Sequence, residues 1–352
     1  MKKSRKILCV VLILIIVILA AIVSAVMIRD NQKTENKTAT VEENKIEEVV
    51  VKEIPKVDII DVNSKTRPYA IVVNNTPVAV KVQTGLNKAY MVYEIPTEGN
   101  TSRLMALYKD IDEDLTVGTI RSSRHNFMDY AFESNAILVH YGWSHYSEDE
   151  QRAGIIDYIN GLFDTPFWRS NPEKLASEHT AYTSIGKLKN EVAKKGFKTN
   201  SEGTVLLNYN VEDIELSQKD NAKIANEVTI PYGSKPNVTS FKYDENSKMY
   251  NRIENGIPCV DHKTKEQVNT KNIIVQKISY TMCSDNYYWN LNTVGSGEGY
   301  FITNGYAVPI KWSKTSRKAK TKYTYLDGKE IEVSDGRTYI EIQTTKQELT
   351  IE

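Results

Sequence analysis

Cysteine is scarce in this chain, with only Cys9, Cys259 and Cys283 among 352 residues. Three cysteines cannot build the disulfide framework that is typical of small secreted domains. Cys259 and Cys283 could pair if their strands were neighbours, but we expect two unpaired, buried thiols. No spacing of cysteine and histidine resembles a structural zinc site, and the sequence indicates no metal and no cofactor.

The chain also lacks an excess of charge of either sign, because 45 lysines and arginines balance 45 aspartates and glutamates. No net charge draws the whole protein towards nucleic acid or an acidic membrane surface. We therefore expect no nucleic-acid partner, and any electrostatic recognition must be local.

Residues 7–28 form an uncharged apolar run that is preceded by four basic residues within 1–6. A helix of about 20 apolar residues spans roughly 30 Å of hydrocarbon. The positive-inside rule leaves residues 1–6 in the cytoplasm and the bulk of the chain outside. The run exceeds the apolar region of a cleaved signal peptide, although residues 23–25 form an acceptable cleavage pattern. We predict a single-pass signal-anchor in the cell membrane over residues 7–28.

Glycine and aromatic residues are absent from residues 30–65, which are rich in charged residues and contain one proline, Pro55. Such a segment cannot bury enough apolar surface to offset its loss of conformational entropy. We predict a disordered, charged tether over residues 29–66.

The rest of the sequence divides into two halves of different pattern. In residues 67–200, expected strands at 69–75, 89–96, 102–110 and 135–143 are combined with expected helices that begin near Phe127 and Ser147 or cover 184–195. Residues 204–346 contain mostly strand patterns, and Asn304-Gly305 and Asp327-Gly328 predict tight hairpin turns. We predict an α+β fold, in which a mixed α/β N-terminal domain (67–200) is followed by a mainly β C-terminal domain (204–346).

Several long motifs resemble the YerB-like lipoprotein family, among them RPYAIVVNN, VGTIRSSRHNFMDYA, AILVHYGWS and NTVGSGEGYFITNGYAVPIKWSK. The resemblance extends over nearly all of the expected folded part. It implies a bacterial, extracytoplasmic protein with an N-terminal and a C-terminal domain of unknown function, and it brings no established reaction. The chain departs from the family in two respects. It has a predicted transmembrane anchor where members typically carry a lipid-attachment cysteine, and Tyr141, Gly142 and Trp143 stand where the family pattern often has glycines.

The motif VGTIRSSRHNF contains two arginines, Arg121 and Arg124, around two serines. If Ser122 or Ser123 caps the following helix, the first amide groups and the guanidinium groups together form a site for a carboxylate or a phosphate. The alternative is structural: the arginines pair with Glu94 and Glu98, and the serine only caps the helix.

Glu94 and Glu98 are four residues apart, with Arg103 nearby on the next expected strand. Two carboxylates can divide the roles of general acid and general base, as in glycoside hydrolysis, if one of them is held neutral. Nearby arginines favour the ionised form of both, and hence a structural ion network.

Three histidines, His140, His145 and His179, lie in the N-terminal half, and their spacing matches no metal-binding signature. His140 ends an apolar strand, where α/β sheets often place functional side chains. We expect a neutral, hydrogen-bonded His140, either in a pocket or in the core. Phe167, Trp168 and Arg169 offer a surface that either stacks on sugar rings or fills the edge of the core.

We therefore predict one ligand-binding set in the N-terminal half, consisting of Glu94, Glu98, Arg103, Arg121, Ser122, Arg124, His140 and His179. Three functions remain open. The protein binds an anionic cell-wall component, or it is a cell-wall polymer hydrolase that uses Glu94 or Glu98, or it is a scaffold for envelope protein partners. The residues define no reaction, so the sequence leaves open whether the protein is an enzyme.

Overall fold

The computed structural model describes residues 57–202, 205–233 and 237–352. The predicted cytoplasmic segment (1–6), the predicted signal-anchor (7–28) and most of the predicted tether (29–66) lie outside these residues. Within the described ranges, no helix combines the length and the apolar character needed to cross a membrane.

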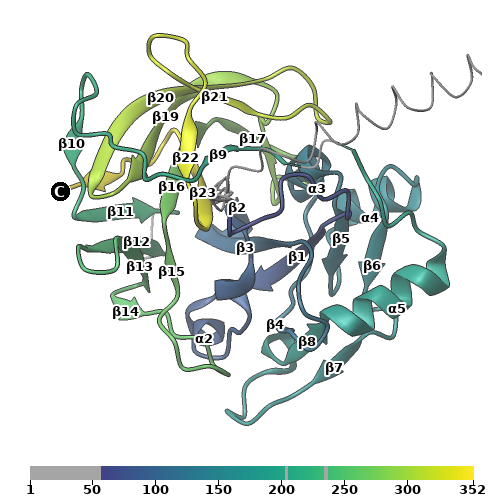
Figure 1. Cartoon of the computed structure of the whole chain (residues 1–352). Helices are drawn as coiled ribbons and strands as arrows, with labels where there is room; N and C mark the ends of the chain where they lie inside the picture. The colour runs from purple at the N-terminus through teal and green to yellow at the C-terminus, as the bar shows by residue number, and fades with distance from the viewer. Residues whose placement is uncertain (1–56, 203–204, 234–236) are drawn as a thin grey trace, which may run out of the picture. The chain divides into compact units, whose positions relative to one another are not determined.

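A mixed sheet of eleven strands receives strands from both halves of the sequence (Figure 1). The N-terminal half contributes β1 (Tyr69–Asn74), β2 (Met91–Thr97), β3 (Thr101–Tyr108), β5 (Ile137–His140) and β6 (Tyr158–Asn160). The C-terminal half contributes β10 (Lys223–Ile224), β16 (Asn272–Ile278), β19 (Gly295–Thr303), β20 (Tyr306–Lys314), β21 (Lys322–Tyr325) and β23 (Thr338–Thr344). The halves meet where β2 pairs in parallel with β23, so the backbone ladder of the sheet continues across this seam.

The predicted strands of the N-terminal half are confirmed. The strands β2 and β3 form the expected antiparallel hairpin, and β3 also pairs antiparallel with β1. Strands β1, β5 and β6 are mutually parallel, so their carboxyl ends lie at one edge of the sheet. The same edge receives the beginning of β3, because Asn74 at the end of β1 is opposite Arg103.

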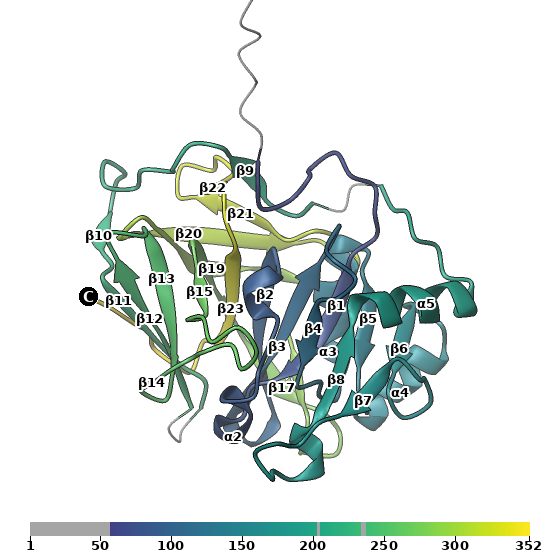
Figure 2. The same cartoon turned by 60° about the horizontal axis from the view of Figure 1, so that its bottom comes forward.

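Both faces of the large sheet are covered. One face packs against α5 (Ile185–Lys195) and against a six-stranded sheet built mainly from β11 (Glu227–Pro231), β12 (Val238–Asp244) and β13 (Met249–Glu254). The other face packs against α3 (His125–Ala131) and the chain between 205 and 216. Figure 2 shows β11, β12 and β13 alongside the C-terminal strands of the large sheet.

Short elements complete the fold. They are α2 (Pro77–Val80), α4 (His145–Arg152), the three-stranded sheet of β4 (Thr116–Gly118), β8 (Ala181–Ser184) and β7 (Phe167–Arg169), the peripheral strands β14 (Ile257–Pro258), β15 (Asn269–Thr270) and β24 (Thr350–Ile351), and the pairs β17 (Tyr280–Met282) with β18 (Trp289–Leu291) and β22 (Glu332–Ser334) with β9 (Asn208–Asn210). Helices are few and the C-terminal half is rich in strands, so the predicted α+β class is confirmed. Cys259 and Cys283 are both free thiols.

Two predicted helix starts differ from the structure. Helix α3 begins after Arg124, and no side chain caps it, whereas Ser122 or Ser123 was the expected cap. Helix α4 begins after Ser144, whose hydroxyl accepts a hydrogen bond from the backbone N–H of Ser147. The apolar residues expected on that helix, Ile155, Ile156 and Ile159, come after its end, and Ile159 lies in β6. The helix therefore consists of its cap and polar residues without an apolar face.

Residues 57–66 were assigned to the tether from their composition, but they contact the folded body. Ile60 is buried and Val57 packs against the same core. The carboxylate of Asp335 accepts hydrogen bonds from the backbone N–H groups of Asp58 and Ile59, at 2.7 and 3.0 Å. A few apolar residues within a charged segment are therefore enough to anchor it, and the folded body begins before Arg67.

Candidate functional site

The segment 117–124 crosses the edge of the sheet where β1 and β5 end. The backbone N–H of Asn74 donates to the carbonyl of Thr119 at 2.8 Å, and the N–H of Tyr141 donates to the carbonyl of Arg121 at 3.0 Å. The N–H of Ser123 donates to the carbonyl of Gly142, also at 3.0 Å. These bonds fix the backbone of the segment against both strand ends, so the side chains of Arg121 and Arg124 are presented from a rigid support.

Three arginines gather at this edge, and we call Arg103, Arg121 and Arg124 the arginine cluster. Arg124 forms a bidentate ion pair with Glu98, in which Nε lies 2.8 Å from Oε2. Arg103 lies 3.8 Å from the same carboxylate and also donates to the backbone carbonyl of Ser122. Arg121 pairs with Glu178 at 3.2 Å. Of the ion pairs expected for Arg121 and Arg124, only that of Arg124 with Glu98 is present, because Arg121 pairs with Glu178.

The positive charge of the cluster is only partly neutralised. Burial, together with repulsion from Arg124 and Arg121, lowers the pKa of Arg103 to about 9, although Glu98 acts in the opposite direction. Burial acts to raise the pKa of Glu98, but the hydrogen bond and charge of Arg124 outweigh it, so this pKa lies below its usual value. The Nε atom of Arg121 is buried and has no hydrogen-bond partner among the described residues. The side chain of Arg121 as a whole retains 23% of its exposure, so an anion placed here would meet its outer nitrogens and reduce the repulsion.

Ser122 belongs to this site, but it does not cap a helix. Its hydroxyl donates to the carbonyl of Tyr141 at 3.0 Å. The hydroxyl of Ser123 donates to the carbonyl of Arg124, and it accepts a hydrogen bond from Ser147. Helix α3 has only seven residues and begins after Arg124. The expected anion site at a capped helix start is therefore not formed, which leaves the guanidinium groups to hold an anion.

His179 lies beside the arginine cluster. Its Nδ1 atom is 2.8 Å from Nδ2 of Asn74, and its Nε2 atom is 3.6 Å from Oε1 of Glu178, the partner of Arg121. Burial and the charge of Arg121 lower the pKa of His179, against the effect of Glu178. The imidazole therefore supports the residues that hold Arg121.

His140 is fully buried next to the cluster, and both of its ring nitrogens are already bonded. Its Nδ1 atom lies 2.7 Å from the carbonyl oxygen of Gly142, and its Nε2 atom lies 2.7 Å from Oε1 of Gln151. Burial lowers the pKa of His140 to about 4. This histidine is a neutral group that orients the loop after β5, and it has no free nitrogen for a ligand.

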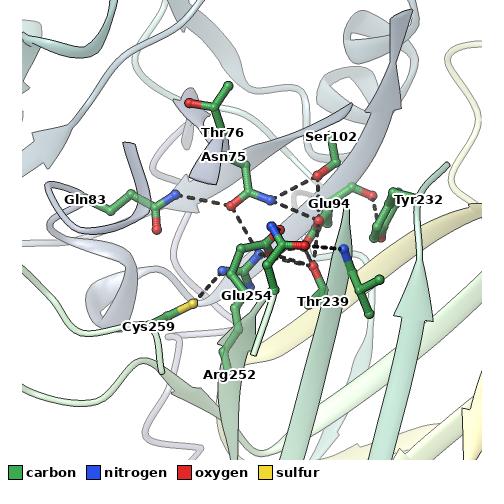
Figure 3. Close-up of polar contacts among 12 residues, drawn as sticks. Asn75, Thr76, Gln83, Glu94, Ser102, Tyr232, Thr239, Arg252, Glu254 and Cys259 are labelled. Carbon is green, nitrogen blue, oxygen red and sulfur yellow. Dashed lines mark hydrogen bonds and ion pairs between the residues drawn. The ribbon is translucent and has the colours of Figure 1, made fainter. Parts of the chain in front are cut away.

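Glu94 lies on the opposite face of the sheet from Arg103, within the polar network that Figure 3 shows. Side chains alternate between the faces of a strand, so Glu94 points to the same face as Ser102 and Leu104, whereas Arg103 points to the opposite face. The Glu94 carboxylate is completely buried and accepts hydrogen bonds from Asn75, Ser102, Thr239 and Arg252 at 2.6 to 3.0 Å. The sheet itself therefore separates Glu94 from Arg103 and its partner Glu98.

Sequence reasoning missed the residues that the C-terminal half adds to the site. The loop between β17 and β18 places Tyr288 so that its ring lies 5.1 Å from the guanidinium carbon of Arg124. In the same loop, Asp285 lies 3.6 Å from Nε2 of His145. These contacts join residues more than a hundred positions apart, and no local pattern in the sequence indicates them. Both halves thus contribute to the site.

A cavity of 840 Å³ lies elsewhere, against β19 and β20, and its wall includes Lys277, Gly297, Tyr300 and Trp312. None of the predicted ligand-binding residues lines it. The arginine cluster is instead a partly buried surface site, since the side chain of Arg121 retains 23% of its exposure.

Comparisons with known proteins agree with the resemblance seen in the motifs. Residues 58–198 match the N-terminal domain, and residues 228–340 the C-terminal domain, of a protein family of unknown function, DUF3048. The chain is 31% identical over 286 residues to the putative lipoprotein YerB of Bacillus subtilis (strain 168). The aligned region covers 79% of this chain and 82% of that protein. The crystal structure of the YerB protein from Bacillus subtilis is similar, with a TM-score of 0.68 and 29% identity over 79% of this chain and 90% of that one.

Proposed function

The chain belongs to the DUF3048 family, and we propose that it is an extracytoplasmic protein, anchored in the membrane, that binds an anionic cell-wall component through the arginine cluster. A relative that is named a putative lipoprotein supports attachment to a membrane with the folded body outside the cytoplasm. The observation that carries the binding proposal is the convergence of three guanidinium groups on one edge of the sheet, where Glu98 and Glu178 supply the counter-charges.

Guanidinium groups suit such a ligand because their planar array of donors matches the oxygens of a carboxylate or a phosphate. Arg124 is occupied by Glu98 and only 10% exposed, so we assign the main contact to Arg121, whose side chain is 23% exposed. Arg103 is buried, so it contributes positive charge without contacting the ligand. Water screens the electric field of a buried charge only weakly. Asn74, Ser122, Glu178 and His179 act as positioning residues.

The hydrolase alternative has less support. Catalysis by paired carboxyl groups requires both to face one substrate, with one of them protonated. Glu94 is fully buried on the opposite face of the sheet from Arg103, and the pKa of Glu98 lies below its usual value because of Arg124. No specific contact among the described residues favours the scaffold alternative.

The test is sedimentation of the detergent-solubilised full chain with purified cell-wall sacculi. Removing one charge-assisted contact costs about 1.5 to 3 kcal/mol, so Arg121→Ala should weaken retention by about tenfold or more. Arg152→Ala is the matched control, because its guanidinium is 58% exposed and pairs with Glu148 on α4, outside the cluster. Equal retention of wild type and Arg121→Ala would remove the cluster from the proposal, whereas equal losses in both variants would indicate binding by net charge alone.

A further inference from the structure

Aromatic side chains flank the arginine cluster on the side of the C-terminal half. Tyr288 lies against Arg124, and the ring of Tyr287 follows at 4.9 Å from that of Tyr288, nearly perpendicular to it. Tyr287 is 58% exposed, which is unusual for a large aromatic residue. His145 adds a further ring, 5.5 Å from Tyr288.

A second aromatic group flanks the cluster from the N-terminal half. The backbone of Tyr141 is bonded to Arg121 and Ser122, and its ring packs edge-on against Phe167 at 5.6 Å. The guanidinium of Arg169 lies 4.8 Å from the Tyr141 ring. Only the backbone of Tyr141 meets the segment 121–124, and its ring is held by Phe167, Arg169 and the core, so the pair of Tyr287 and Tyr288 is the aromatic surface that stays open beside the cluster.

A simple anion such as phosphate would use only the guanidinium groups, and it would leave the flanking rings without a role. An exposed tyrosine such as Tyr287 offers an apolar face and a polar edge, which match the C–H face and the hydroxyl groups of a sugar ring. Resting on the proposed function, we propose that the anionic group recognised at Arg121 is carried by a sugar, so that the ligand is an acidic glycan with a neighbouring ring on Tyr287 and Tyr288.

Single-stranded nucleic acid also combines rings with negative charge and is bound by basic grooves with aromatic platforms. The relative that is named a putative lipoprotein disfavours nucleic acid here, because it supports a location of the folded body outside the cytoplasm. The experiment includes it as a competing ligand.

Isothermal titration of the full chain with four probes tests the inference. Oligogalacturonate carries a carboxylate on each sugar ring, polyphosphate of matched charge carries anions without rings, a chitooligosaccharide carries rings without charge, and oligo-dT represents single-stranded nucleic acid. We expect oligogalacturonate to bind about tenfold tighter than each of the other three, because only it engages both the arginines and the rings.

Two substitutions on the β17–β18 hairpin separate the contributions. Tyr287→Ala should weaken oligogalacturonate binding by about tenfold and leave polyphosphate binding unchanged. Met282→Ala removes another exposed apolar side chain of the same hairpin, 43% exposed, and should change neither affinity.

The outcomes distinguish the two levels of the argument. Equal affinities for oligogalacturonate and polyphosphate, both reduced by Arg121→Ala and neither by Tyr287→Ala, would overturn the glycan inference and leave anion binding intact. The absence of binding to both anions would overturn the proposed function, and the glycan inference with it. Tightest binding to oligo-dT would replace the glycan by a nucleic acid.

Discussion

A buried acidic network at the seam between the two halves predicts how the stability of the protein depends on pH. Three carboxyl groups, those of Glu94, Glu254 and Glu341, lie around a single guanidinium, that of Arg252 (Figure 3 shows all but Glu341). Arg252 Nη2 lies 2.9 Å from both Glu94 and Glu254. One positive charge cannot compensate three buried negative charges, so some of these carboxyl groups must be protonated in the folded protein.

Glu254 is the group of this network with the most accessible titration. Burial raises its pKa to about 7, and the nearby Glu94 adds to this effect, while Arg252 opposes it. The ordinary pKa of the side chain is 4.5, so the folded protein holds this proton more tightly than the unfolded chain. The contribution to stability is therefore complete below about pH 4.5 and is lost as the pH rises to about 7. At 1.36 kcal/mol per pH unit, the loss amounts to about 3 kcal/mol.

Glu254→Gln removes this titration while it keeps the shape of the side chain. Between pH 4.5 and pH 8, the free energy of unfolding should decrease in both proteins. We expect the decrease to be about 3 kcal/mol smaller in the variant than in the wild type. Some dependence on pH should remain, since burial also raises the pKa of Glu341 well above its usual value. Urea unfolding of the full chain, followed by tryptophan fluorescence at several pH values, provides the measurement.

The control is Glu245→Gln, which lies on the exposed turn between β12 and β13 and should follow the wild-type profile. Parallel pH profiles for the wild type and Glu254→Gln would refute the reasoning, because they would mean that Glu254 has nearly the same pKa in the folded and unfolded chains. A larger loss of stability in the variant at high pH would mean that the ionised Glu254 stabilises Arg252.

Two further predictions concern the loop after β5 and the free thiols. Gly142→Ala should destabilise the protein by more than the roughly 1 to 2 kcal/mol that a left-handed backbone costs, because a Cβ atom there would lie 2.9 Å from the hydroxyl of Ser122. Gly154 has a similar φ and open space around it, so urea unfolding of Gly154→Ala measures the backbone cost alone. Equal losses of stability in the two variants would contradict the clash. In the folded protein Cys283 should react with a thiol reagent faster than Cys259, because Cys259 is completely buried and Cys283 only partly; equal rates under native conditions would contradict this order.

Most strands of the N-terminal half could be predicted because their signal is local. The run before Asn74 is apolar throughout, as expected of a strand that is covered on both faces. Helix α5 was predicted equally well, since Ser184 caps its start and Gly196 ends it in a left-handed conformation. The end of helix α4 was predicted wrongly, because apolar residues of the next strand follow this short polar helix closely in the sequence. Their spacing continues a helical pattern beyond the residue where the helix ends.

The candidate site was predictable only in part. The pairing of Arg124 with Glu98 was predicted correctly, but the position of Glu94 was not. Glu98 follows Glu94 by four positions, and the strand ends between them. The period of two holds within β2 and ceases at the turn that begins with Glu98, so the spacing alone does not define a common face. Tyr288 and Arg252 reach these residues from the other half of the chain, and only the tertiary fold brings them there.

The strand pair β2–β3 gives the two polar assemblies of the protein their separate roles. Alternation along these strands directs Glu94 to the buried network, where Arg252 joins it across the seam, and Arg103 to the opposite face, where it meets Glu98. The parallel ladder between β2 and β23 holds the same seam through the backbone. Because the C-terminal half also supplies Tyr288 to the arginine cluster, a ligand bound there would contact both halves at a place where the sheet already fixes their relative position. The proposed binding surface thus draws residues from both family domains, so we expect neither domain alone to contain all of it.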